Sequence, residues 1–222
     1  MSNFNVIPDT SGLVSEDLKK QMIPLFQKLR KRVLLVAIID LEDEKSIELG
    51  AFLKAVVSCS DSLELQFVQK GENLKVQKEL HGEHLPVVGI YDGEGYSGAC
   101  YHGTPGGKEI NSFIAAICNV GGAAQPLDKK TKKKIDSIEK DTNIKIFVSL
   151  ACHHCPHIVA ACQKIAAASP YVTADMYDAR LYPDIVEKYG IERVPMTVVN
   201  DTVVIMGKKT IDEILERIEN IS

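Results

Sequence analysis

The chain has 222 residues, of which 45% are hydrophobic, and its formal net charge is -4. This length and apolar content suit one large domain or two small domains with packed cores. The negative charge argues against nucleic acid or an anionic membrane as the main partner.

Residues 1–17 have neither a basic stretch nor an apolar core, so we predict no signal peptide. The longest apolar run, 33–39, is too short to cross a bilayer. Six cysteines in such a chain are typical of a reducing compartment and predict a cytoplasmic protein.

The first half of the chain alternates between strand-like and helix-like patterns. In chain order we expect a strand at 33–39, a helix at 44–57, a strand at 63–68, a short helix around 72–80, a strand at 87–91, a strand near 96–101 and a helix at 108–118. The helix at 44–57 follows Leu41-Glu42-Asp43-Glu44, and acidic residues stabilise a helix start.

A glycine pattern between two of these strands matches the dinucleotide-binding fingerprint, with Gly93, Gly95 and Gly98 at the required spacing. That fingerprint needs a helix to begin at its end, where the helix N-terminus holds the pyrophosphate. The following residues, 99–105, cannot be helical. We therefore predict a hairpin turn at Asp92-Gly93 and no nucleotide site.

The middle of the chain reads as a linker over residues 119–128, with Gly121, Gly122 and Pro126. A helix follows in which Leu127, Ile135 and Ile138 point inward. Its lysines point largely outward: Lys129, Lys130, Lys132, Lys133 and Lys134. A solvated helix face is the expected role for these lysines, and a docking site for an acidic partner is the alternative.

Two thiols, in Cys152-His153-His154-Cys155, directly follow a strand predicted at 144–150. Apolar residues then recur at helical spacing, and Cys155 begins this stripe. Cys152 falls off the stripe at the helix N-terminus, where backbone N–H groups and the helix dipole favour a thiolate. We therefore expect a redox-active disulfide in which Cys152 is the exposed nucleophile and Cys155 the buried resolving thiol.

The histidines within this motif support the redox interpretation and also raise an alternative. His153 and His154 can stabilise a thiolate by charge or hydrogen bond, which lowers the pKa of the thiol. Together with His157, however, the motif residues are all metal ligands, so a non-catalytic metal-binding module is the competing hypothesis. Structural zinc sites usually draw a second ligand pair from elsewhere in the chain. We find none, because His81 and His84 have no thiol partner nearby and the other cysteines are scattered singly: Cys59, Cys100, Cys118 and Cys162. We predict no metal site, and we expect these four cysteines to be structural or incidental thiols.

The second half repeats the order of elements of the first half. After 144–150 we expect a helix around 157–168, a strand at 171–177, a helix around 183–189, strands at 196–200 and 202–206, and a helix at 210–220. Leu85-Pro86 and Val194-Pro195 occupy equivalent places, each opening a later strand. This order, with a strand-end CxxC, is the thioredoxin-like pattern. We therefore predict an α/β protein with two tandem thioredoxin-like folds, each a mixed sheet flanked by helices, at 18–122 without a CxxC and at 127–222 with one.

The thioredoxin-like pattern gives Pro195 a specific expectation. A proline at this place is normally cis and faces the active disulfide. Val194 would then offer its backbone N–H and C=O to an extended substrate segment. An ordinary proline at a strand start is the alternative.

From about residue 18 to its end, the chain resembles the N-terminal domain of the flavoprotein subunit of alkyl hydroperoxide reductase. The resemblance is carried by the two fused folds and by short motifs: Gly103-x-Pro105-x-x-x-Glu109, Gly121-Gly122, Ser149-Leu150-x-Cys152-His153-x-Cys155-Pro156 and Val194-Pro195. In that family the domain is an electron relay. A thioredoxin-reductase-like flavoprotein module reduces its disulfide, and the resulting dithiol reduces a two-cysteine peroxiredoxin.

The resemblance implies roles for individual residues of this chain. Cys152 would attack the peroxiredoxin disulfide and Cys155 would resolve the mixed disulfide. The strand before the motif has no carboxylate, and the family places a glutamate from the first half near the disulfide. Glu109 matches that glutamate and could act as a general base for Cys155. The alternative is that Glu109 only caps the helix at 108–118.

The resemblance also implies that this chain itself holds no cofactor, since FAD and NAD(P)H belong to a separate reductase or to further modules. The chain is then either a domain of a longer protein or a stand-alone relay. A general protein disulfide reductase or isomerase is the alternative enzymatic hypothesis.

Overall fold

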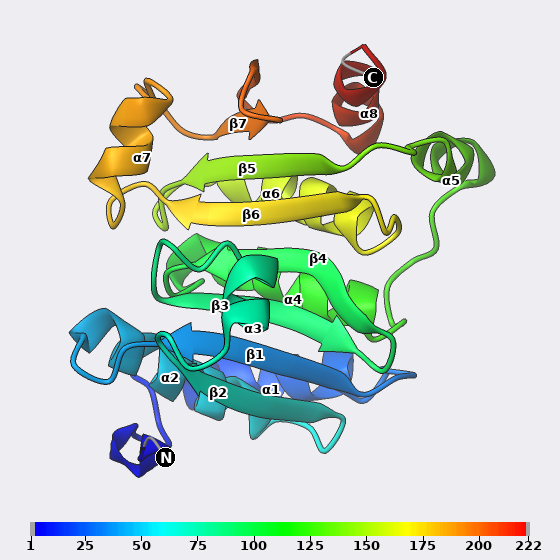
Figure 1. Cartoon of the computed structure of the whole chain (residues 1–222). Coiled ribbons are helices and arrows are strands. Elements are labelled where there is room, and N and C mark those ends of the chain that lie inside the picture. Colours follow the sequence, from blue (N-terminus) through cyan, green and yellow to red (C-terminus); the bar gives the residue numbers. More distant parts are fainter. Residues whose placement is uncertain (1–2, 221–222) are drawn as a thin grey trace.

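Alternating strands and helices assemble into one mixed sheet with helices on both faces (Figure 1). The computed structural model describes residues 3–220. Within that range the eight strands are β1 Val33–Ile39, β2 Leu63–Gln69, β3 Val87–Asp92, β4 Gly95–His102, β5 Thr142–Val148, β6 Val172–Asp178, β7 Met196–Val199 and β8 Val203–Met206. The α-helices there are α1 Glu16–Phe26, α2 Glu44–Val57, α3 Leu74–Glu79, α4 Ile110–Val120, α5 Lys129–Asp136, α6 Cys155–Ala166, α7 Pro183–Lys188 and α8 Ile211–Glu219, with short 3-10 helices at Phe4–Val6 and Gly107–Glu109.

The strand order β2-β1-β3-β4-β6-β5-β7-β8 contains the same arrangement twice. In each half the first two strands are parallel, and the next two add on as antiparallel strands. The halves meet where β4 pairs in parallel with β6, a junction that we call the seam. The predicted α/β class with thioredoxin-like folds is confirmed. The division at 18–122 and 127–222 stays a prediction, since the sheet continues across the seam.

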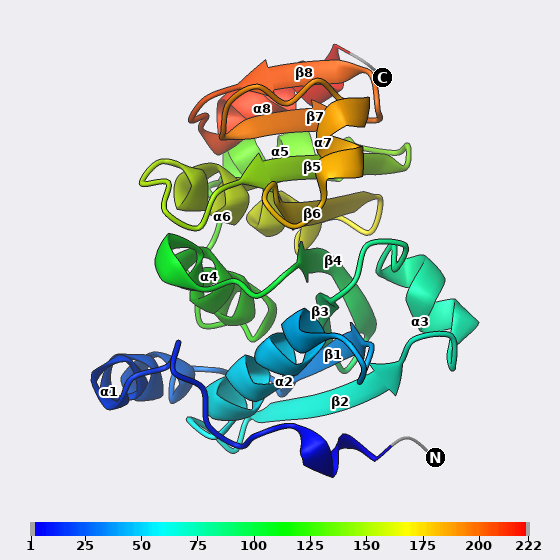
Figure 2. The same ribbon diagram turned by 90° about the vertical axis from the view of Figure 1, so that its left-hand side faces the viewer.

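Apolar side chains form one continuous core on the face covered by α2, α4 and α6 (Figure 2). This core takes residues from both halves, from Ile7 to Ile218 in α8, because alternate residues of each strand point to the same face. On the opposite face α3 and α7 cover two smaller clusters, one in each half. The redox motif lies on the side of the larger core, at the start of α6.

Most predicted elements are present, with small shifts at their ends. The helix after the redox motif begins at Cys155, two residues earlier than expected, because Pro156 is accommodated in the first helical turn. The expected hairpin joins β3 to β4. Helix α1 was not predicted; it carries Pro24 in its interior, a residue that normally breaks helices.

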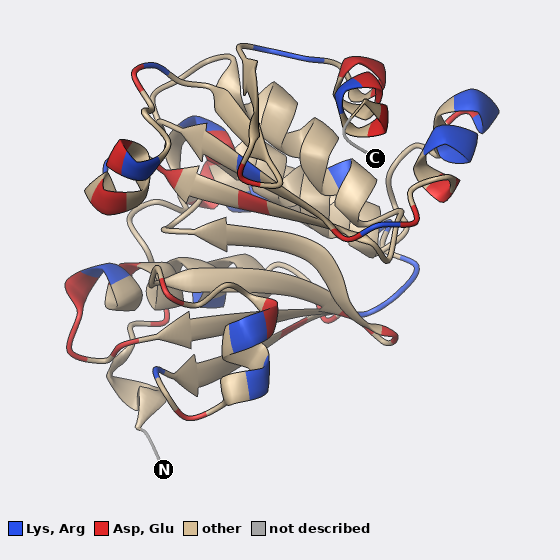
Figure 3. Ribbon diagram, turned by 45° about the horizontal axis from the view of Figure 1, so that its top comes forward, with Lys and Arg blue, Asp and Glu red and all other residues tan. Residues whose placement is uncertain are grey.

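Local chemistry fixes the start of α2 as the sequence predicts. Asp43 caps α2, where its carboxylate accepts a hydrogen bond from the N–H of Ser46 at 2.7 Å. In α5 the buried residues are Thr131 and Ile135, and the lysines gather on the outside of the helix (Figure 3).

Over residues 3–220, every helix is too short or too polar to cross a membrane.

Candidate active site

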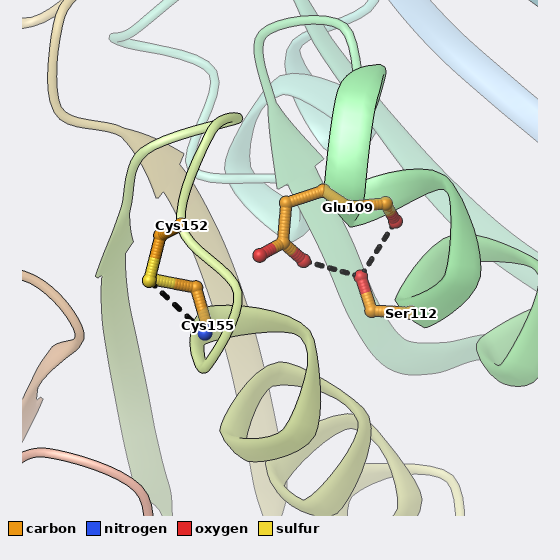
Figure 4. The surroundings of a disulfide bond; sticks show 4 residues. All are labelled: Glu109, Ser112, Cys152 and Cys155. Carbon is orange, nitrogen blue, oxygen red and sulfur yellow. Dashed lines mark hydrogen bonds between the residues drawn. A yellow bond between two sulfur atoms is a disulfide. The ribbon is translucent and has the colours of Figure 1, made fainter.

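A disulfide joins Cys152 to Cys155, with their Cα atoms 5.6 Å apart (Figure 4). Strand β5 ends at Val148 and the motif forms the turn between this strand and α6. Cys152 is half-buried, whereas Cys155 is completely buried in the larger core. An incoming thiolate can therefore reach the sulfur of Cys152 more easily than that of Cys155.

Cys152 lies three residues before the first residue of α6, at the helix N-terminus as the sequence predicts. The N–H of Cys155 donates a hydrogen bond to Cys152 Sγ at 3.2 Å. This N–H is one of the four at a helix start that have no partner within the helix. A thiolate at this position would receive the same hydrogen bond, which stabilises its charge.

The histidines in and next to the motif lie at the protein surface. His153, His154 and His157 are exposed, and His154 is the residue that precedes α6. A pocket of about 390 Å³ lies next to the motif and is lined by Lys108, Asn111, Ser112, His153, Pro156, His157 and Ala160. Both halves of the chain contribute to this pocket.

Val194 and Pro195 directly precede β7, the strand that pairs with the end of β5 before the motif. The Val194–Pro195 peptide bond is cis, and so is the Leu85–Pro86 bond at the equivalent place in the first half. Strand β7 begins directly after Pro195, and its first residue, Met196, pairs with Phe147 near the end of β5. Val194 and Cys152 both pack against the larger core as partly buried residues. The role of Val194 and Pro195 in docking a substrate stays a prediction.

Glu109 is fully buried and its carboxylate faces the disulfide (Figure 4). Ser112 Oγ donates a hydrogen bond to Glu109 Oε2 at 2.5 Å, while Oε1 has no hydrogen-bond partner among the described residues. Burial raises the pKa of Glu109 to about 7, and the nearby charge of Asp178 acts in the same direction. Glu109 precedes α4 without making a capping hydrogen bond through its side chain, so simple capping does not describe it. A carboxyl group with this pKa can both accept and release a proton near neutral pH.

The loop that carries Glu109 also contacts the redox motif through the backbone. The N–H of Lys108 donates a hydrogen bond to the carbonyl of Leu150, two residues before Cys152, at 2.9 Å. Gly107 permits this approach, because a Cβ atom at this residue would lie 2.6 Å from the Leu150 carbonyl oxygen. The first half thus supports the motif of the second half directly.

A second cluster of reactive groups was not foreseen from the sequence. Cys100, expected to be a structural or incidental thiol, lies next to His102 and to Asp175 of the other half. The histidine-bearing segment that contains His81 and His84 also contacts this cluster, which corrects the expectation that these histidines have no thiol nearby. The sequence pattern Cys100-x-His102 indicates only that these two side chains share a face of one strand. It does not indicate that β4 pairs with β6, which brings Asp175 to them.

Comparisons with known proteins agree with this architecture. The family model described as Thioredoxin domain matches residues 142–219. The chain is 28% identical over 207 residues to the alkyl hydroperoxide reductase protein AhpF of Pseudomonas aeruginosa, which is 93% of this chain and 37% of that protein. The AhpF protein of Staphylococcus aureus is also 28% identical, over 206 residues. The chain therefore spans less than two fifths of the length of these relatives.

Solved structures extend the comparison to both halves. A mutant AhpF from Enterococcus faecalis superposes with a TM-score of 0.88 and 37% identity, covering 91% of this chain and 98% of the other. The NTD_N/C domain of the same protein gives a TM-score of 0.87 and 38% identity, with the same coverage. A protein disulfide oxidoreductase from Aeropyrum pernix shares the fold, with a TM-score of 0.84 at 20% identity, and covers 94% of this chain and 93% of its own.

Proposed function

This chain belongs to the family of N-terminal domains of the alkyl hydroperoxide reductase protein AhpF, and from that premise we propose that it relays electrons to a two-cysteine peroxiredoxin. It is a thiol–disulfide oxidoreductase of the thioredoxin fold. The donor in the proposal is a thioredoxin-reductase-like flavoprotein, which carries the FAD and uses NAD(P)H. The observation that carries the proposal is the Cys152–Cys155 pair, in which one half-buried sulfur is bonded to one fully buried sulfur.

In each turn, the proposed cycle takes two electrons and two protons from the donor and passes them to the acceptor. A donor dithiol first reduces the Cys152–Cys155 disulfide and is itself oxidised to a disulfide. The Cys152 thiolate then attacks the acceptor disulfide, forms a mixed disulfide and releases one acceptor thiolate, which is protonated. Cys155 next attacks Cys152 Sγ, which restores the internal disulfide and releases the second acceptor thiol.

Glu109 is proposed to handle the proton of Cys155. Cys155 is completely buried, so its thiol needs a base before it can attack the mixed disulfide. The Glu109 carboxylate lies on the side facing the disulfide, and its Oε1 has no protein hydrogen bond among the described residues. We propose that Glu109 accepts this proton and returns it when the disulfide is next reduced.

Docking of the acceptor is proposed at the start of β7 and in the pocket beside the motif. Val194 would pair with an extended acceptor segment through its backbone, as in strand addition. His153 and His154 would stabilise the Cys152 thiolate when the disulfide opens.

Trapping of the mixed disulfide tests the order of the two cysteines. We expect Cys155→Ser to accumulate a covalent complex with an oxidised two-cysteine peroxiredoxin, because the resolving thiol is missing. Cys152→Ser should form no such complex, since the remaining thiol is buried. The measurement is non-reducing gel electrophoresis with mass spectrometry of the linked peptides.

An unrelated disulfide protein, such as insulin, serves as the control acceptor. Equal trapping of both acceptors would support the general protein disulfide reductase in place of the relay. Trapping by Cys152→Ser alone would overturn the assignment of nucleophile and resolving thiol.

A further inference from the structure

Three ligand-type side chains meet at the seam, on the opposite face of the sheet from the redox motif. Cys100 and His102 are alternate residues of β4, so they point to the same face. The parallel register places Cys100 beside Asp175 and His102 beside Tyr177 of β6. Cys100, His102 and Asp175 are all completely buried. A polar or acidic side chain is rarely fully buried unless it is hydrogen-bonded, paired with an opposite charge or bound to a metal.

The two β4 side chains already have the orientation that a metal site requires. His102 Nδ1 lies 2.8 Å from the backbone carbonyl of His84, an acceptor, so Nδ1 carries the proton. The Nε2 lone pair is then free, and Nε2 lies 3.6 Å from Cys100 Sγ. A carbonyl that fixes the ring of a ligand histidine is a common outer partner in metal sites.

The carboxylate of Asp175 is held in place from the other side. Its Oδ2 lies 2.9 Å from His81 Nδ1 and accepts a hydrogen bond from Asn143 at 2.5 Å. Its Oδ1 accepts a hydrogen bond from the Cys100 thiol at 2.9 Å. A single proton on Cys100 therefore occupies the space between the sulfur and the carboxylate.

We propose that Cys100 Sγ, His102 Nε2 and Asp175 Oδ1 bind a zinc ion at the seam between the two halves. One ligand atom from each of these residues lies within 4.8 Å of the others. A tetrahedral zinc ion with ordinary bond lengths holds sulfur and nitrogen ligands about 3.5 Å apart, close to the 3.6 Å between Sγ and Nε2. Binding replaces the proton of the Cys100 thiol, which is released to solvent as the Zn–S bond forms.

The donor set selects the class of metal. Thiolate and imidazole ligands favour zinc and similar transition metals over magnesium and calcium, which prefer oxygen ligands. The fourth coordination position falls to water or to His81, which already contacts Asp175. A pocket of about 260 Å³ is lined by His81, His84 and Tyr177, which contact the cluster, although none of the three proposed ligands lines it. Because the ligands come from β4 and β6, the ion would join the two halves across the seam.

Cobalt titration of the full chain tests the site. The protein is stripped with a chelator and kept with the Cys152–Cys155 disulfide oxidised, so that the motif cysteines cannot bind metal. We expect one equivalent of Co²⁺ to bind, with a thiolate-to-cobalt absorption band in the near ultraviolet that Zn²⁺ abolishes by displacement. We expect Cys100→Ser to eliminate the band and Asp175→Asn to weaken cobalt binding at least tenfold, with circular dichroism reporting that each variant is folded.

Matched controls use the other free thiols, since Cys118→Ser and Cys162→Ala should keep the band. The proposal is overturned if the folded wild-type protein binds no stoichiometric cobalt, or if the band survives in Cys100→Ser. It is equally overturned if the band depends on Cys118 or Cys162. If Cys100→Ser does not fold, Asp175→Asn decides, and unchanged cobalt affinity in that variant contradicts the site. None of these readouts depends on peroxiredoxin reduction, so failure of the relay proposal can be told apart from failure of the zinc-site proposal.

Discussion

Glu109 shows how burial can turn an ordinary side chain into a group suited to proton transfer. Its carboxyl group has a pKa raised from 4.5 to about 7, with burial as the main cause. Its one hydrogen bond to another side chain, from Ser112, favours the charged form but does not outweigh burial. A sequence motif could identify this residue, but its burial and the direction of its carboxylate follow from packing between the two halves.

Replacing Glu109 by glutamine should remove the base while preserving shape. In the wild-type protein we expect the rate at which Cys155 resolves the mixed disulfide to rise with pH around 7, as Glu109 loses its proton. In Glu109→Gln this inflexion should be absent, and the rate at pH 8 should fall on the order of 100-fold. Rapid mixing with a preformed mixed disulfide measures the step, and Glu187→Gln on the exposed face of α7 is the control.

The same variant has an independent stability signature. Between pH 4.5 and 7 the folded wild-type protein retains a proton on Glu109 that the unfolded chain has released. The free energy of unfolding therefore falls as pH rises across this window, by roughly 3 kcal/mol in total. Glu109→Gln cannot ionise, so its stability relative to wild type should increase by this amount and level off above pH 7. A rate defect without this signature would mean that Glu109 is not protonated in the folded protein at pH 5.

At the scale of elements, most strands and helices could be predicted because the apolar pattern has the period of each element. The run 33–39 and the helix at 44–57 were predicted with their observed ends. The ends of α6 were less accurate, because a proline in the first turn is compatible with more than one helix start. Helix α1 was not predicted, because a proline inside a helix is unfavourable and only two of its residues, Met22 and Phe26, are fully buried.

The start of α2 illustrates an element held by a single side chain. Where the second half carries its cysteines, the first half has Asp43, whose carboxylate caps the helix. We expect Asp43→Ala to lower the free energy of unfolding by about 1 kcal/mol, measured by urea denaturation. Disulfide exchange should be unchanged, because α2 lies away from the motif. Glu42→Ala, one residue earlier and exposed, is the matched control, and an equal loss in that variant would contradict a capping role.

At the scale of the whole molecule, the seam between β4 and β6 decides what the two halves can share. The sequence predicted the order of elements within each half, but apolar alternation does not specify which edge strands pair across a repeat. The cluster of Cys100, His102 and Asp175 therefore could not be foreseen. The continuous core beneath α4 and α6 also depends on the pairing of β4 with β6, so it could not be predicted either.

Gly98 tests the importance of the seam for both halves. Its φ is +80°, and a Cβ atom would lie 2.3 Å from the carbonyl oxygen of Val172 at the start of β6. We expect Gly98→Ala to cost roughly 3 kcal/mol of stability, followed by circular dichroism because the chain has no tryptophan. Gly93→Ala, whose Cβ meets nothing within 4 Å, should change stability by less than about 0.5 kcal/mol. Hydrogen exchange should accelerate alike in β1 and β5, and a change confined to one half would contradict a shared seam.

The hydrogen bond from Lys108 to Leu150 has a consequence for modularity. A thioredoxin-like fold is usually an exchangeable unit that brings its own active site along. Here the turn before Cys152 is supported by a loop from the other repeat, and the buried carboxylate comes from that same loop. The half that carries Cys152 and Cys155 therefore does not form a complete active site alone, and the half without a CxxC contributes groups that the site needs. Any transplant or truncation that preserves the chemistry must keep the two repeats together.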